Sequence, residues 1–109
     1  MHPFLEQHLP SIEQLCLKHK VSKLYVFGSL ASGRFDEKNS DADFIVAFEP
    51  SSNRGLAQNY LNLMVDLSKI LQRSVDLLLD EPIENPYFKE ELDETKMLIY
   101  EQAGEEVLV

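Results

Sequence analysis

Apolar residues recur along this chain with two different periods. Short, mostly apolar runs, typical of buried strands, occupy residues 23–27, 41–48, 75–79 and 97–100. Longer stretches at 11–19 and 54–71 carry apolar residues three and four positions apart, which predicts amphipathic helices. Because helices and strands alternate, we expect an α/β fold with a small mixed β-sheet flanked by helices.

Local signals indicate where helices and loops begin. Ser11-Ile12-Glu13-Gln14 has the spacing of a capping box, so the first helix is expected to begin at Ser11. A short helix is expected around Leu30–Gly33, and a loop is expected to open at Pro50. Asn85-Pro86 predicts the N-cap and first residue of a further helix.

The strongest chemical pattern follows the first predicted strand. That strand stops at Gly28-Ser29, a turn whose small residues, N–H groups and hydroxyl suit a phosphate. The next strand begins with Asp41 and Asp43, which project from one face, roughly 6 to 7 Å apart along the chain. Carboxylates beside a phosphate-binding turn suit Mg²⁺, which prefers oxygen ligands. The pattern therefore predicts nucleotide chemistry.

Asp76 interrupts the otherwise apolar run Val75–Leu79. An acid inside such a strand needs a partner, because burying an unpaired carboxylate is costly. It could form an ion pair with Arg73 or a nearby lysine. It could instead join Asp41 and Asp43, either as a metal ligand or as the base that takes a proton from an acceptor.

The order Gly28-Ser29, Ala31, Gly33 and Ser40-Asp41-x-Asp43 resembles the signature of the minimal nucleotidyltransferases (MNT). These form the smallest branch of the DNA polymerase β-like nucleotidyltransferase superfamily. The run at 75–79 resembles the strand that carries the family's third acid, and the run at 97–101 resembles its C-terminal strand. The resemblance implies one MNT domain over residues 1–109 with a polymerase β palm-like fold. It also implies that the first two strands are antiparallel, with the active site at their acidic ends.

The resemblance further implies a nucleotidyltransferase that uses ATP and Mg²⁺. Asp41, Asp43 and Asp76 would be catalytic and would hold two metal ions about 4 Å apart. An acceptor hydroxyl would attack the α-phosphorus, and pyrophosphate would leave. The residues expected to bind the nucleotide are Gly28, Ser29, Ser40 and Arg34.

Similar stand-alone MNT proteins are commonly antitoxins of HEPN-family ribonuclease toxins, and some transfer AMP to a tyrosine of the toxin. We therefore expect a HEPN-type toxin as partner and acceptor. One alternative is an antitoxin that acts by binding alone, with idle acids. Ser32 stands where members often carry Arg, and the loop before Asp41 is about one residue longer than usual. A second alternative is a small-molecule enzyme of the aminoglycoside-modifying type, although those usually carry extra helices.

Charge and composition limit the kinds of partner and the cellular compartment that we expect for this protein. A net charge of −9 and a pI near 4.6 disfavour direct nucleic-acid binding. The many acids of the last third form either a solvated face or a docking surface for a basic partner. The lone Cys16 predicts a buried structural thiol, and neither a signal peptide nor a membrane span is indicated, so we expect a cytoplasmic protein. The apolar Val107–Val109 leaves a homo- or hetero-oligomer open.

Overall fold

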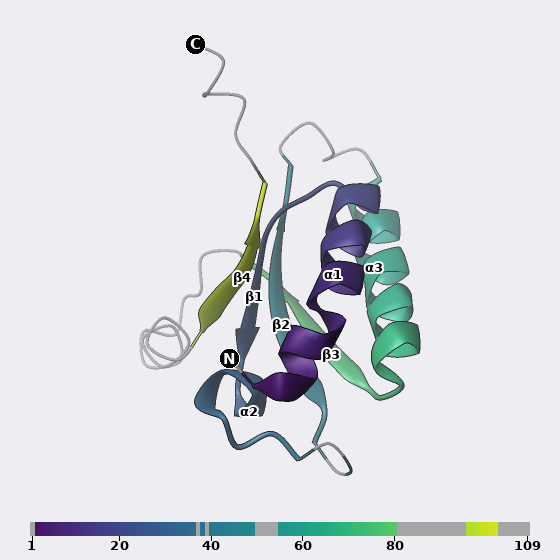
Figure 1. Cartoon of the computed structure of the whole chain (residues 1–109). Helices are drawn as coiled ribbons and strands as arrows, with labels where there is room; N and C mark the ends of the chain where they lie inside the picture. Colours follow the sequence, from purple (N-terminus) through teal and green to yellow (C-terminus); the bar gives the residue numbers. More distant parts are fainter. Residues whose placement is uncertain (1, 37, 39, 50–54, 81–95, 103–109) are drawn as a thin grey trace, which may run out of the picture.

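The computed structural model describes residues 2–36, 38, 40–49, 55–80 and 96–102. Figure 1 shows helices α1 and α3 side by side on one face of a sheet, with the short α2 at the end where β1 stops. The expected α/β fold with a small mixed sheet and flanking helices is confirmed. The elements are α1 (Pro3–Lys18), β1 (Val21–Phe27), α2 (Ser29–Ser32), β2 (Ala42–Phe48), α3 (Leu56–Leu71), β3 (Val75–Leu79) and β4 (Met97–Glu101).

The four strands lie in the order β3-β2-β1-β4. β1 runs antiparallel to both β2 and β4, as expected for the first two strands, whereas β2 and β3 are parallel. β2 therefore has a strand on each side. The pairing places Asp43 opposite Phe27 on β1 and opposite Asp76 on β3.

The core lies between the sheet and the helices α1 and α3. Alternate strand residues face the helices, and the residues between them, including Asp43 and Asp76, face the other side. Burial raises the pKa of the Cys16 thiol to about 12, in line with the structural thiol that the sequence predicts. Fully buried members of this core include Ile12, Cys16, Leu24, Val26, Phe44, Val46, Leu63 and Leu67.

The predicted start of the first helix is wrong. α1 begins at Pro3, eight residues earlier than the expected start at Ser11, which lies exposed inside the helix. His2 is the N-cap, and its Nδ1 accepts a hydrogen bond from the N–H of Phe4 at 3.1 Å. Proline is well suited to the first helical position, and Phe4 and Leu5 are buried. Their packing outweighs the N–H that Pro10 lacks inside the helix.

The other predicted bounds are close to those observed. β1 begins at Val21 instead of residue 23, β2 begins at Ala42 instead of Asp41, and β3 has its predicted bounds. Asp41 therefore precedes the strand that it was expected to open. The Asn85-Pro86 helix start, the loop at Pro50 and the tail 107–109 lie outside the described residues. Among the described helices, none combines the length and the apolar character that crossing a bilayer requires.

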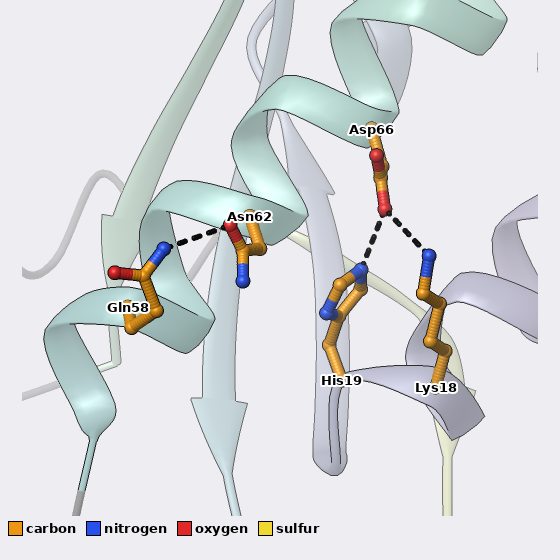
Figure 2. A network of polar contacts seen from close by, with 5 residues as sticks. All are labelled: Lys18, His19, Gln58, Asn62 and Asp66. Carbon is orange, nitrogen blue, oxygen red and sulfur yellow. Dashed lines mark hydrogen bonds and ion pairs between the residues drawn. The ribbon is translucent and has the colours of Figure 1, made fainter.

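A polar contact joins the end of α1 to the middle of α3 (Figure 2). The Nε2 of His19 lies 2.7 Å from the Oδ2 of Asp66, and the Nζ of Lys18 lies 3.5 Å from the same oxygen. Its hydrogen bond with His19 lowers the pKa of Asp66. His19 is only 6% exposed, so its ring depends on this partner. The exposed pair Gln58 and Asn62 lies on the same helix, where the Nε2 of Gln58 donates to the Oδ1 of Asn62 at 2.9 Å.

Replacing Asp66 with Asn tests this contact. The variant keeps the shape of the side chain but removes the charge that faces a buried imidazole. We expect the free energy of unfolding at pH 7 to fall by about 1 kcal/mol, measured by urea unfolding. Because the pKa of Asp66 is lowered in the folded state, this difference should shrink as the pH falls through that pKa.

Asn62→Ala is the matched control, because it removes an exposed hydrogen bond from the same helix. Its effect should stay within about 0.5 kcal/mol. Equal losses in the two variants would mean that α3 is sensitive to any polar change and that the His19 contact has no special weight.

Candidate active site

Two carboxyl groups meet on the sheet face opposite the helices. Asp43 on β2 and Asp76 on β3 are register partners in the parallel pair, and their side chains are hydrogen bonded. Burial, the hydrogen bond and charge of Asp76, and the charge of Asp41 together raise the pKa of Asp43 to about 6. Asp43 therefore holds a proton more tightly than an isolated aspartate would.

Asp41 lies beside this pair and is more exposed. It precedes β2, and its charge reaches Asp43. No group of three His, Cys, Asp or Glu side chains within the described ranges stands close enough together to hold a metal ion. The structure thus brings Asp43 and Asp76 into contact and leaves Asp41 adjacent to them.

Asp76 makes none of the ion pairs recorded between described residues, so the expected alternative of a salt bridge to Arg73 is not what the structure contains. The guanidinium of Arg73 donates instead to two backbone carbonyls, those of Leu71 and Ser40. The exposed Asp76 has Asp43 as its neighbour, as in the other alternative that the sequence left open.

Gly28 shapes the turn that faces Asp43. Its φ is +64°, and a Cβ at this position would lie 2.6 Å from the Oδ2 of Asp43. Only glycine combines this backbone conformation with so close an approach. The turn then leads into α2, where the N–H of Ser32 donates to the carbonyl of Gly28 at 3.0 Å.

The remaining predicted nucleotide-binding residues lie around this turn or in the loop before Asp41. Ser29 is half-buried at the first position of α2, and its carbonyl accepts from the N–H of Arg34 at 3.1 Å. The side chain of Arg34 is exposed. The Oγ of Ser40 accepts from the N–H of Asp36 at 3.0 Å, so Ser40 also closes the loop.

A cavity of about 340 Å³ lies beside α2. Its lining includes His2 from the N-terminal end of α1, Ser32 from α2 and Met97 from β4. The three acids do not line it. Room for part of a ligand therefore exists next to the turn, on its α1 side.

The donor set suits a divalent cation that prefers oxygen. The carboxyl groups of Asp43 and Asp76 lie in contact, and a cation between them would offset the repulsion of their charges. A third carboxylate, Asp41, stands close enough for its charge to act on the pair. The carboxyl groups of Asp43 and Asp76 therefore suit Mg²⁺, and Asp41 would have to move closer to them to become a third ligand.

Sequence comparison adds to this geometry. The family model described as "Polymerase beta, Nucleotidyltransferase" matches residues 11–105. A protein of Methanocaldococcus jannaschii, "Putative protein adenylyltransferase MJ1379", is 40% identical over 83 residues, covering 76% of this chain and 79% of the relative.

Solved structures share the fold. A "putative minimal nucleotidyltransferase" superposes with a TM-score of 0.68 at 28% identity, over 85% of this chain and 90% of that one. A toxin-antitoxin complex with AMP-PNP contains a chain with a TM-score of 0.65 at 19% identity, covering 92% and 78%. A complex of a tri-AMPylated Shewanella oneidensis HEPN toxin with an MNT antitoxin contains one with a TM-score of 0.61 at 16% identity, covering 94% and 77%. The last two likenesses concern the fold alone.

Gly28→Ala should lower the free energy of unfolding by about 1 to 3 kcal/mol, because the new Cβ adds backbone strain and meets the Oδ2 of Asp43. Gly33→Ala is the matched control: Gly33 also has a positive φ, of +82°, but no described atom lies within 4 Å of its added Cβ. Urea unfolding should show the larger loss for Gly28→Ala. If the contact with Asp43 matters, the loss should shrink in an Asp43→Ala background.

Asp43→Asn should raise the melting temperature more at pH 8 than at pH 5. At pH 8 the two ionised carboxylates repel each other, and Asn removes this repulsion. As the pH falls through about 6, folded wild type binds a proton that the unfolded chain, with its lower Asp pKa, still lacks. Wild type therefore gains stability on acidification and approaches the variant. Thermal melts across this range measure the difference.

Asp80→Asn controls for the loss of one negative charge, because Asp80 is an exposed acid just beyond the far end of β3. Identical behaviour of the two variants would show that net charge, and not the pair of carboxyls, causes the pH dependence.

Proposed function

The chain belongs to the polymerase β nucleotidyltransferase family, and we propose that it transfers AMP from ATP to a hydroxyl group of a partner protein. The observation that carries this proposal is the contact between the carboxyls of Asp43 and Asp76 beside the Gly28-Ser29 turn. A family of transferases and a carboxylate pair at a glycine turn together favour nucleotidyl transfer over a purely structural role.

In this proposal Asp41, Asp43 and Asp76 hold Mg²⁺, with two ions in the working site. When bound, Mg²⁺ neutralises charge on the triphosphate and on the departing pyrophosphate. Ser29 and the backbone N–H groups that begin α2 orient the outer phosphates. Ser40 and the exposed Arg34 complete the surroundings of the nucleotide.

The acceptor hydroxyl oxygen attacks the α-phosphorus of ATP in line with the bond that breaks. A phosphorus–oxygen bond forms to the acceptor, and the bond to pyrophosphate breaks. Asp76 is exposed, so its carboxylate can reach the acceptor and take the hydroxyl proton. Positioning of the two reactants supplies much of the acceleration.

A HEPN-type toxin is the partner that we propose. The support comes from the fold neighbours, since one such complex contains a tri-AMPylated HEPN toxin with an MNT antitoxin. The curated relative is named as a protein adenylyltransferase, which agrees with a protein acceptor. The chain would then act as the antitoxin of the pair.

Labelled ATP tests the proposal. Incubation of the chain with α-labelled ATP, Mg²⁺ and the proposed HEPN-type toxin should place label on that protein. Asp43→Asn should slow labelling by on the order of 100-fold or more, because a charged ligand facing the triphosphate is lost. Asp80→Asn, which alters an acid beyond the far end of β3, should label at the wild-type rate.

Toxin neutralisation separates transfer from binding. If Asp43→Asn still neutralises the HEPN protein as well as wild type does, the chain works by covering its partner, and the transfer mechanism is wrong. Absence of label on the partner with wild-type protein would contradict the proposed acceptor.

A further inference from the structure

Arg73 connects three segments that lie far apart in the sequence. It sits between α3 and β3, and its Nε donates to the carbonyl of Leu71, the last residue of α3, at 3.2 Å. Its Nη1 donates to the carbonyl of Ser40 at 3.2 Å. Its Cζ lies 4.4 Å from the ring centroid of Phe4 on α1 and 4.8 Å from that of Phe35. One side chain therefore ties together α1, α3 and the loop before Asp41.

The loop before Asp41 is anchored at both of its ends. Phe35, only 7% exposed, packs against Phe4 with their ring centroids 4.9 Å apart. Asp36 and Ser40 exchange two hydrogen bonds, from Asp36 N–H to Ser40 Oγ at 3.0 Å and from Ser40 N–H to Asp36 O at 2.8 Å. Arg73 contacts both anchors, through the ring of Phe35 and the carbonyl of Ser40.

Asp41 depends on these anchors because it lies outside the strand ladder. The hydrogen bond that Arg73 Nη1 donates to Ser40 O fixes the backbone just before Asp41. The one that the N–H of Ala42 donates to Ser74 O, at 3.1 Å, fixes it just after. Both partners belong to one short segment, which continues into β3 and reaches Asp76. The segment 73–76 thus contacts the backbone on each side of Asp41 and also carries the acid that pairs with Asp43.

Arginine suits this role for a geometric reason. A planar guanidinium can donate along two fixed directions while its face rests on aromatic rings, which a lysine ammonium cannot do. Among the residues that the structure describes, Arg73 takes part in no ion pair, so its donors serve backbone carbonyls. The carbonyl of Leu71 is also one that the end of a helix leaves without an intrahelical partner.

We propose that Arg73 is a positioning residue that fixes the backbone around Asp41, so that Asp41 can join Asp43 and Asp76 in binding a divalent cation. The part concerning the cation rests on the proposed nucleotidyl transfer. The part concerning the backbone does not, because it depends only on contacts within the chain.

Arg73→Gln and Arg73→Lys test the inference against Ile12→Val, a core variant whose stability loss is unrelated to the loop. Amide exchange followed by NMR reports on the loop. The N–H of Ser40 should exchange about tenfold faster in Arg73→Gln, with a smaller increase in Arg73→Lys, which keeps the charge but not the planar donor pair. In Ile12→Val its rate should match wild type.

Mn²⁺ binding, measured by calorimetry well below the melting temperature of every variant, reports on the acids. The dissociation constant should rise about tenfold in Arg73→Gln, as is typical when a group that supports a metal ligand is removed. Arg73→Lys should fall between Arg73→Gln and wild type, and Ile12→Val should bind Mn²⁺ as wild type does.

Equal Ser40 exchange rates in Arg73→Gln and Ile12→Val would overturn the inference, even if wild type proves to be an active transferase. Faster exchange with unchanged Mn²⁺ affinity would overturn the link to the acids. If wild type binds no Mn²⁺ and labels no partner, the proposed function and the cation part fail together, and the Ser40 exchange rate alone decides whether Arg73 holds the loop.

Discussion

Two acidic side chains face each other across a parallel strand pair, and this contact constrains the rest of the site. Ionised carboxylates in that arrangement repel, so a proton or a cation between them stabilises the strand pair. Burial of apolar residues on the opposite face holds the strands in register in spite of the repulsion. The core therefore fixes a pair of acids that would separate if they were free. At this pair, the repulsion that destabilises the fold is also the property that favours binding of a cation.

Much of this arrangement could be predicted from the sequence. The strand around Phe44, the long helix ending at Leu71 and the run around Leu77 each carry a strong periodic pattern, because one face of each is buried. Asp41 and Asp43 are spaced to project together, and Asp76 stands alone in an apolar run. These patterns indicated that the three acids contribute to one site. These signals are local, so a single chain is enough to reveal them.

Features set by tertiary packing escaped prediction. Ser11 satisfies a capping pattern, yet the burial of Phe4 and Leu5 extends the helix past it to Pro3. The sequence suggested Arg73 only as a possible ion-pair partner for Asp76. Nothing in the local sequence shows that the rings of Phe4 and Phe35 converge on its side chain. An aromatic residue inside an otherwise polar loop, as at Phe35, was the one available hint that this loop is anchored. Contacts of this kind join residues more than thirty positions apart, and periodicity cannot report them.

The two paired acids differ in how firmly their strands are held. Asp43 belongs to an interior strand with neighbours on both sides, whereas β3, which carries Asp76, has one neighbour in the described sheet. A strand at a sheet margin frays more readily than one inside it. A metal ion bound by both acids would then hold the edge strand β3 against β2. Binding of the ion and fraying of β3 would then be thermodynamically coupled. The protein without the ion would be the state in which β3 is most open to strand exchange or proteolysis.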